Sequence, residues 1–429
     1  MTMRLGERLA TQTPPRRQAG ISLVLMALSL VMLLSFTALA LDGSNLYIAR
    51  NELQNAADAG ALAGARVLYV ADGSSVNSGA DAVAAATAAS NASQGTAVEV
   101  TSVRRGHWSF ATRTFTPNSS LDPVDLFGVS AAELDADPNF INAVEVVTER
   151  NATAVPAFFG FIFGHESYQA AARAVAYIGF AGTLRPEDVD QPVAICKDRL
   201  LSGGEYVCSV GTFIPSSSDE LTSETGGWSS FSQDDACLGG TSTSELRPLV
   251  CASGNPMPMT LGKDVATHGG QSEATFKDLY DCWDENTGQE ELWNMTLPVI
   301  DCPDANVGPC NRLSGAVNVN VVFVVDQANK IDDDAPRRME LPDFDGDGAS
   351  DGIWENDSPD GATRWNDFVT TFNIQKPDGT LALWDSDPST TGWRQKTIYF
   401  LPDCSFHEPT GLSGGENFGV LAQIPVLVD

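Results

Sequence analysis

An uncharged apolar run near the N-terminus constrains this chain more than any other feature of its sequence. Residues 21–41 read ISLVLMALSLVMLLSFTALAL and include no charged side chain. A helix of this length spans roughly 31 Å, which matches the hydrocarbon core of a bilayer. Four arginines precede the run and Asp42 follows it, so the positive-inside rule predicts a cytoplasmic N-terminus at residues 1–20. These arginines are Arg4, Arg8, Arg16 and Arg17.

A cleaved signal peptide is the alternative to a retained anchor. Ala38-Leu39-Ala40 offers the small-x-small pattern of a cleavage site. The apolar core of a signal peptide normally has about 7–15 residues, and this run is longer. The sequence therefore favours a transmembrane anchor at 21–41 that crosses the membrane once.

The apolar run continues into a segment built almost wholly of small residues. From Gln54 to Ala65, eight of twelve residues are Ala or Gly, and Leu62 is the only large apolar side chain. No proline lies between Asp42 and Leu68, which predicts one helix that continues beyond the membrane. Small side chains allow close packing, either against a helix of another protein or against this chain's own sheet. The predicted helix-packing residues are Ala57, Gly60, Ala61 and Gly64.

Charge and cysteine content narrow the class of protein. The chain has 429 residues and a formal net charge of −31, which argues against nucleic-acid binding because phosphate contacts need clustered lysine and arginine. All eight cysteines follow residue 190, and none forms a CxxC pair. An even number of cysteines in an exported region favours disulfides, with free buried thiols as the alternative. The disulfide candidates are Cys196, Cys208, Cys237, Cys251, Cys282, Cys302, Cys310 and Cys404.

Sequence proximity suggests two pairs without deciding the connectivity. Cys302 lies close to Cys310, and Cys196 lies close to Cys208. Short loops are the simplest to bridge, although eight cysteines allow many pairings.

Residues 42–181 alternate helical and strand patterns. An alanine-rich helix is predicted at 80–92, followed by a hairpin at 97–118 and strands at 143–150 and 171–180. The aromatic stretch FFGFIFG at 158–164 predicts a short helix or turn packed on the sheet.

Residues 182–429 form a second, cysteine-rich region with fewer regular signals. Strands are predicted at 317–326, 396–403 and 420–429, with one helix at 276–286. The predicted fold class is α+β: a transmembrane helix continuing into a long helix, a small antiparallel sheet, and a loop-rich, disulfide-bonded mixed β domain.

Several motifs in order match a known family. Arg16-Arg17 and Gly20 precede the apolar run, Leu41-Asp42-Gly43 and Leu46-Tyr47 follow it, and LQNAADAGALAGA occupies 53–65. GHWSFATRTFTPN, NAVEVVTER, AVPAFFGFIFG and AARAVAYIGF come later. On these motifs, residues 16–180 resemble TadE/TadG-like Flp pilus-assembly proteins. The resemblance implies a pilin-like helix in the bacterial inner membrane, a periplasmic region, and contacts with other pilus-assembly proteins or pilin-like helices.

Two departures from related patterns matter. Prepilins carry Glu at the fifth position after the cleavage Gly, whereas this chain has Leu25. Some TadG-type proteins carry a von Willebrand factor A domain with a DxSxS metal site, but Asp326 is followed by QANK and both serines are missing. The sequence therefore predicts neither prepilin processing nor that domain.

One acidic loop has the pattern of a calcium ligand set. Asp343, Asp345, Asp347 and Asp351 occupy positions 1, 3, 5 and 9 of DFDGDGASD. Gly348 gives a sharp turn that lets alternate carboxylates converge on a hard cation. The prediction is a structural Ca²⁺ ion, with an acidic solvated turn as the alternative.

Signals for catalysis are weak. Gly411-Leu412-Ser413-Gly414-Gly415 matches GxSxG, yet no histidine follows it, as a nucleophile elbow would need. The sequence therefore predicts no enzyme and no small-molecule substrate, but a membrane-anchored component of Flp (tight adherence) pilus assembly. The alternative is an envelope-anchored adhesin or ligand-binding module, and an exported hydrolase is disfavoured.

Overall fold

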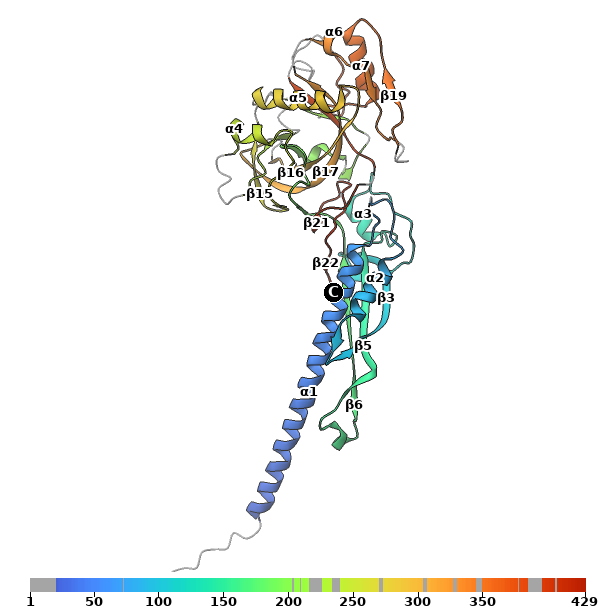
Figure 1. Cartoon of the computed structure of the whole chain (residues 1–429), viewed down its shortest axis with the longest axis vertical. Helices are drawn as coiled ribbons and strands as arrows, with labels where there is room; N and C mark the ends of the chain where they lie inside the picture. The colour runs from blue at the N-terminus through green and yellow to red at the C-terminus, as the bar shows by residue number, and fades with distance from the viewer. Residues whose placement is uncertain are drawn as a thin grey trace, which may run out of the picture.

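The computed structural model describes residues 21–429, except for 72, 203, 209, 216–225, 234–239, 270–272, 304–306, 327–329, 345–348, 377, 385–395 and 406. Helix α1 (Ile21–Arg66) runs alone from one end of the elongated molecule to a sheet near its middle (Figure 1). A larger region lies on the far side of that sheet.

Helix α1 is continuous over 46 residues, which confirms the prediction of one helix through and beyond the apolar run. At 1.5 Å per residue it is roughly 69 Å long. Its first half is exposed, with Ala38 as the only buried residue between Ile21 and Leu41. Its second half buries Leu53 together with the predicted packing residues, among them Gly60 and Gly64.

An antiparallel sheet of five strands packs against the second half of α1. Its order is β22-β6-β5-β3-β4. Helix α2 (Ala80–Ala89) packs beside α1 and contacts β3 and β5 on the same sheet. The strands are β3 (Glu99–Ser109), β4 (Thr114–Pro117), β5 (Ala143–Pro156), β6 (Ser167–Tyr177) and β22 (Val426–Leu427). The smaller elements of this module are β1 (Ala92–Ser93), β2 (Thr96–Ala97) and α3 (Ala131–Ala136).

Strands β5 and β6 extend past the rest of the sheet as a long hairpin. Their register shifts between Arg150 and Val155, and the tip contains the 3-10 helix η1 (Gly160–Phe163). The predicted short helix at 158–164 is therefore confirmed, but its predicted packing on the sheet is wrong. The side chains of Phe158, Phe161, Ile162 and Phe163 are 59–65% exposed.

The second region is built on a sheet of seven strands in the order β12-β20-β17-β15-β13-β9-β16. An added β16–β17 pairing closes five of these strands into a ring. The described pairings are antiparallel except for β9 with β16, so the arrangement differs from a doubly wound parallel sheet. The strands are β9 (Val193–Cys196), β12 (Thr212–Pro215), β13 (Gly226–Ser229), β15 (Asp264–His268), β16 (Trp293–Ile300), β17 (Cys310–Val325) and β20 (Thr397–Pro402).

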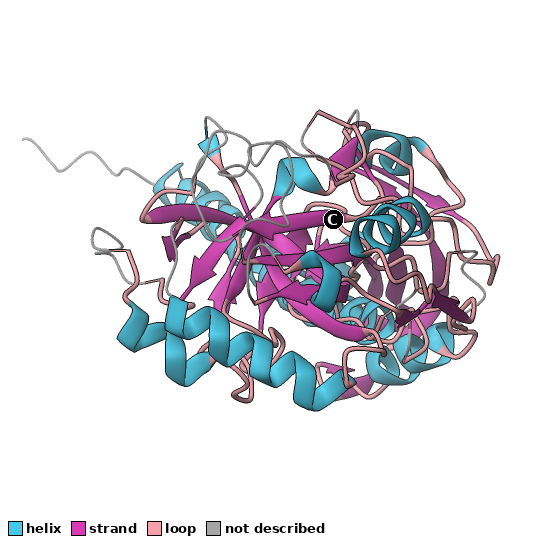
Figure 2. Ribbon diagram, turned by 90° about the horizontal axis from the view of Figure 1, so that it is seen from above, coloured by secondary structure: helices cyan, strands magenta, loops and turns pink. Residues whose placement is uncertain are grey.

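Helices and short strands surround this sheet, and seen from above the strands gather centrally (Figure 2). The predicted helix at 276–286 is confirmed as α5 (Glu273–Thr287). Phe323 of β17 lies at the centre of an aromatic core. Its ring packs near those of Trp283 of α5 and of Trp365 and Phe368 of α7 (Gly361–Thr371). The other helices are η2 (Lys197–Arg199), α4 (Thr243–Leu246), η4 (Arg247–Leu249) and α6 (Ile331–Asp334). The short strands are β7 (Phe180–Ala181), β8 (Thr183–Leu184), β10 (Leu201–Ser202), β11 (Glu205–Tyr206), β14 (Met259–Thr260), β18 (Arg338–Glu340), β19 (Ile353–Glu355) and β21 (Ser413–Gly415).

The end of the chain returns to the first module. Strand β21 pairs with β7, and β22 pairs with β6. The strand predicted at 420–429 is thus limited to β22 and lies in the five-stranded sheet. The α+β fold class is confirmed, with 29% helix and 33% strand.

Candidate functional site

The small-residue face of α1 is covered by this chain's own α2 and sheet. Ala57 and Ala61 are fully buried. A Cβ atom added at Gly60 would lie 2.8 Å from the Cβ atom of Ala88 and 2.9 Å from the carbonyl oxygen of Ala84. One added at Gly64 would lie 2.7 Å from the Cβ atom of Ala84. The absence of side chains therefore allows the two helices to touch along their backbones.

Helix α2 explains why α1 can be so poor in large residues. Its inward face consists of Ala80, Ala84 and Ala88, all fully buried. Val144 of β5 fills the remaining space, with its Cγ1 atom 3.0 Å from a Cβ position at Gly64. Two small helical faces can bury area together by close approach, where neither could alone. The four predicted packing residues thus lie inside the module.

The junction between the two halves of α1 is fixed to the tip of the β5–β6 hairpin. Asp42, one residue after the apolar run, is only 6% exposed. Its Oδ1 accepts a hydrogen bond from the Phe158 N–H at 2.7 Å, and its Oδ2 accepts one from the Gly160 N–H at 2.7 Å. The Phe159 N–H donates to both oxygens at 3.2 Å. Asn45 adds a bond from its Nδ2 to the Pro156 carbonyl at 3.1 Å.

Further hydrogen bonds hold the second half of α1 along the sheet. The Thr148 hydroxyl donates to the Leu53 carbonyl at 2.9 Å, and Gln54 Nε2 donates to the Arg173 carbonyl at 3.0 Å. The helix is therefore continuous from its exposed apolar half into the folded module and is hydrogen-bonded to that module from Asp42 onward. Sequence reasoning missed this junction, and its only signal was a carboxylate placed directly after the apolar run.

Comparison with known proteins matches the two parts of this module in order. Residues 20–67 match the family described as putative Flp pilus-assembly TadE/G-like. Residues 63–176 match the one described as putative Tad-like Flp pilus-assembly. The N-terminal module belongs to the TadE/TadG-like family. No curated protein and no solved structure matches the chain.

The matched ranges coincide with the observed architecture of the first module, which consists of residues 42–181 with strand β22 and is here called the Tad module. The first covers the whole of α1, and the second runs from the last turn of α1 into β6. One helix in the described part of the chain, α1, is long and apolar enough to cross a membrane. The site at Asp42 therefore lies where the candidate span of this Tad module ends.

The cysteine-rich region beyond the Tad module is held by disulfides between distant segments. Cys196 pairs with Cys302, Cys208 with Cys404, and Cys251 with Cys282. The pairs suggested by proximity in sequence, Cys302 with Cys310 and Cys196 with Cys208, are wrong. The parallel pairing of β9 with β16 brings the ends of these strands together, so Cys196 meets Cys302 instead of a neighbour in sequence. Cys310 is also disulfide-bonded, and Cys237 lies outside the described residues.

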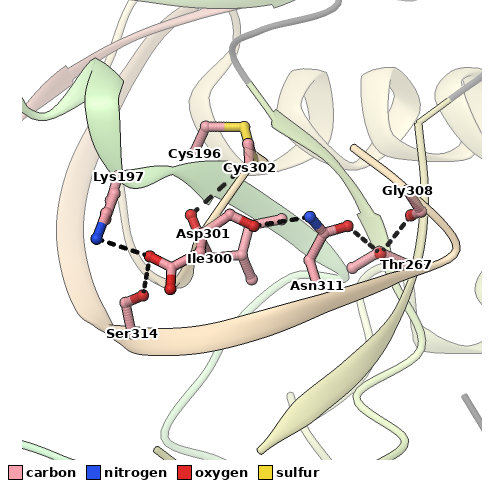
Figure 3. The surroundings of a disulfide bond; sticks show 9 residues. All are labelled: Cys196, Lys197, Thr267, Ile300, Asp301, Cys302, Gly308, Asn311 and Ser314. Atoms are coloured by element: carbon pink, nitrogen blue, oxygen red, sulfur yellow. Dashed lines mark hydrogen bonds and ion pairs between the residues drawn. A yellow bond between two sulfur atoms is a disulfide. The ribbon is translucent and has the colours of Figure 1, made fainter. Parts of the chain in front are cut away.

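A polar hollow of about 720 Å³ adjoins the Cys196–Cys302 disulfide. Figure 3 shows Lys197 and Asp301 beside this bond, with Lys197 Nζ 2.9 Å from Asp301 Oδ1. The Ser314 hydroxyl donates to the same carboxylate at 2.7 Å. Partial burial alone would raise the pKa of Asp301, but the bonds from Lys197 and Ser314 together outweigh it, so the pKa of this carboxyl is lowered. Asp198, Asp264 and Arg312 also line the hollow, which gives it charges of both signs.

The predicted calcium loop is described only at its ends. Asp345 and Asp347 lie outside the described residues. Asp343 is buried and accepts a bond from the Ser405 hydroxyl at 3.3 Å, whereas Asp351 is exposed and accepts one from the Phe344 N–H at 3.0 Å. The described residues show no group of three or more potential metal ligands, and the calcium site stays a prediction.

Ser413 of the GxSxG sequence has a structural position. It lies in β21, where its hydroxyl donates to the Ile424 carbonyl at 3.2 Å and accepts a bond from the Gly179 N–H at 3.2 Å. A nucleophile elbow instead places its serine on a strand-to-helix turn beside a histidine. Ser413 thus joins the end of the chain to the Tad module.

Proposed function

We propose that this chain is a non-catalytic component of Flp pilus assembly, anchored in the bacterial inner membrane by α1. Residues 1–20 face the cytoplasm, and the Tad module and cysteine-rich region face the periplasm. The arginines before α1 and the disulfides after it support this orientation.

The observation that carries the proposal is the continuity of α1. Its exposed apolar half matches a bilayer, and its other half is locked to the sheet of a Tad module. A continuous helix transmits position and orientation, whereas a flexible linker would not. The anchor would thus hold the periplasmic surface in a fixed pose toward other pilus-assembly proteins or pilin-like helices.

The small-residue face does not supply the surface for such partners, because α2 covers it. The exposed side of the same helix, with Tyr47 and Ile48, is available instead. Substitutions that probe contacts with partner proteins should therefore be made on this exposed side of α1.

The first test is deletion of the gene, with surface pili counted by electron microscopy and the gene restored in trans. We expect pili to vanish or become rare and to return on complementation. A second arm complements with a flexible Gly-Ser linker inserted between Leu41 and Asp42, which should fail to restore pili. The same linker inserted between Leu121 and Asp122 is the matched control. An unchanged pilus count after deletion would contradict the assembly role.

We also propose that Asp343, Asp345, Asp347 and Asp351 hold a structural calcium ion. Four carboxylates at positions 1, 3, 5 and 9 of the loop supply the oxygen ligands that Ca²⁺ prefers. Added Ca²⁺ should raise the unfolding temperature of the full chain, and the change of Asp345 and Asp347 to Asn should abolish this rise. Changing Asp281 and Asp284 to Asn is the control, and a Ca²⁺-independent unfolding temperature would favour a solvated turn.

The second candidate function is a ligand-binding or adhesive module on the same anchor. The polar hollow beside Cys196–Cys302 favours it, because its charges of both signs could meet a polar ligand. The test is binding of the full chain in nanodiscs to glycans, cells and surfaces. A strain that assembles normal pili without this protein but adheres poorly would support this candidate over the first.

A further inference from the structure

We propose that the tip of the β5–β6 hairpin inserts its apolar side chains into the membrane interface beside α1, as a second contact with the bilayer. The inference rests on the proposed anchoring by α1 and adds a surface that the anchor alone does not require. The surface consists of Phe158, Phe161, Ile162 and Phe163, here called the hairpin tip.

The hairpin tip is exposed although it is strongly apolar. Its four side chains are 59%, 61%, 64% and 65% exposed. The surrounding segment from Asn151 to Gly164, NATAVPAFFGFIFG, has no charged residue. Exposed aromatic clusters of this kind indicate contact with another apolar phase.

The position of the hairpin tip along α1 identifies that phase. Asp42 accepts the hydrogen bonds of Phe158, Phe159 and Gly160, so the tip lies level with the first residue after the apolar run. A helix of the length of Ile21–Leu41 matches the hydrocarbon thickness. The tip therefore lies at the boundary of the hydrocarbon wherever α1 spans it. Figure 1 shows the end of the hairpin alongside α1.

The backbone of the tip suits an apolar environment. An apolar phase offers no water, so backbone N–H groups need partners within the protein. The Asp42 carboxylate accepts three of them. Within the loop, N–H groups donate to carbonyls from Ile162 to Phe159, from Gly164 to Phe161, from His165 to Gly160 and from Ala157 to Glu166.

The residues flanking the tip have the polarity expected at a headgroup layer. His165 stacks on Tyr168 on one side, and Tyr47 of α1 is 67% exposed a little further from the apolar run. Tyrosine is enriched where a membrane meets water, because its ring is apolar and its hydroxyl polar. The bilayer is thus the occupant that the surroundings favour over a second protein.

A second contact would change what the anchor does. A lone helix rotates about its axis and tilts, whereas a lateral contact through the hairpin fixes both motions. The Tad module would then present one defined side away from α1.

The test uses the wild-type full chain in nanodiscs that contain a phospholipid with a photoreactive diazirine on its acyl chain. After irradiation, crosslinked peptides are mapped by mass spectrometry. We expect lipid adducts on residues 21–41 and on the hairpin tip. The β3–β4 turn around Ala111 is the negative control, since it lies at the opposite end of the sheet.

The outcomes separate this inference from the anchoring on which it rests. Adducts on residues 21–41 but not on the hairpin tip would overturn the inference and leave the anchor intact. No adducts on either segment would contradict the anchoring itself.

A variant gives an independent readout. Changing Phe161, Ile162 and Phe163 together to Ser should abolish lipid adducts on the hairpin while retaining those on residues 21–41. Leu121→Ser removes an exposed apolar side chain outside the hairpin. This control variant should change neither the lipid adducts on the hairpin nor those on residues 21–41. Equal hairpin labelling in the triple variant and the wild type would contradict insertion of these side chains.

Discussion

Asp42 shows how much one side chain can organise at a boundary. Its carboxylate satisfies three consecutive N–H groups of the loop from Phe158 to Gly160. Burying a carboxylate is costly unless it is hydrogen-bonded, and Asp42 is buried. Here the charge and the loop stabilise each other, so the helix and the hairpin meet in one geometry.

Replacing Asp42 by Ala should release the hairpin from α1. A buried N–H group that is left without a hydrogen-bond partner destabilises the folded state by about 1–3 kcal/mol. We expect faster amide exchange at residues 158–160 of the full chain in nanodiscs, measured by mass spectrometry. Asp42→Asn keeps one acceptor oxygen and should have a smaller effect, and Asp122→Ala is the control. Unchanged exchange in Asp42→Ala would show that the loop is held by other contacts.

Glu99 holds the other end of the same hairpin. Its Oε1 accepts bonds from the Thr153 N–H and hydroxyl, each at 2.7 Å, and its Oε2 accepts one from the Ala152 N–H at 3.0 Å. The bond from the Thr153 hydroxyl, then those from the backbone N–H groups, lower the pKa of Glu99 from 4.5 to about 2. The ionised carboxylate thus fixes the bulge where the hairpin leaves the sheet.

This pKa shift predicts an acid-sensitive bulge. Because the folded-state pKa lies below the unfolded value, the stabilisation is complete above about pH 4.5 and is lost as the pH falls toward 2. Glu99→Gln should lower the amide protection factors of residues 151–153 at pH 6, and the difference from wild type should shrink near pH 2. Glu166→Gln serves as the control. A pH-independent difference would mean that the ionised form is not responsible.

At the scale of elements, the packing of α1 against α2 determines how the helices of the Tad module are arranged. The helices meet through Gly60, Gly64 and the alanines of α2, so their distance is set by backbone atoms. Such an interface tolerates little added volume, because the nearest groups on α2 are main-chain or Cβ atoms that cannot move aside as a flexible side chain would.

Gly60→Leu and Gly64→Leu should each destabilise the Tad module itself. Overpacking costs about 1–3 kcal/mol or more where backbone must move. We expect lower yields and greater protease sensitivity of the purified full chain. Gly43→Ala is the matched control, since a Cβ atom there meets nothing within 4 Å. Stable, protease-resistant variants that lose pili would instead indicate a face shared with a partner.

The sequence predicted these elements where the signal was local. The long helix follows from an uninterrupted apolar run and the lack of proline, and the strands of 97–118 and 143–150 follow from alternation. The partner of the small-residue face could not be predicted, because an alanine-rich helix packs equally well on any close neighbour. The exposed hairpin tip was misplaced for a related reason: an aromatic run indicates burial in an apolar phase without saying which one.

Contacts between distant residues lay outside sequence reasoning. Neither Asp42 nor Glu99 forms a motif with its loop, since their partners lie 116 and 54 residues away. The disulfide pairings suggested from sequence proximity were wrong for the same reason, because pairing follows the arrangement of the sheet and not the spacing of the cysteines. The calcium loop was predicted from a contiguous sequence pattern. Only the ends of this loop are described, so the calcium site stays a prediction.

At the scale of the whole molecule, the disulfides stabilise the cysteine-rich region by closing long loops. Cys208 and Cys404 are 196 residues apart, and Cys251 and Cys282 are 31 apart. In the chain-entropy account, a closed loop of the first length stabilises by about 5 kcal/mol and one of the second by about 4 kcal/mol.

Removing the Cys208–Cys404 pair should therefore destabilise the region more than removing Cys251–Cys282. Each pair is changed to serine, and the full chain in nanodiscs is unfolded by heat with α5 and β17 followed by hydrogen exchange. We expect the lower midpoint for the Cys208→Ser/Cys404→Ser variant. The reverse order would mean that native packing around Cys251–Cys282 outweighs loop closure.

The return of β22 to the Tad module has a consequence for biogenesis. Arg173 of β6 forms an ion pair with Asp429, a residue 256 positions later in the chain. In the proposed periplasmic orientation, the edge of β6 that β22 covers stays unpaired until the cysteine-rich region between these two strands has been exported. The five-stranded sheet is thus completed only after the cysteine-rich region, so a paired β6 edge would report that this region has been translocated. A truncated product would keep that edge open to quality-control proteases.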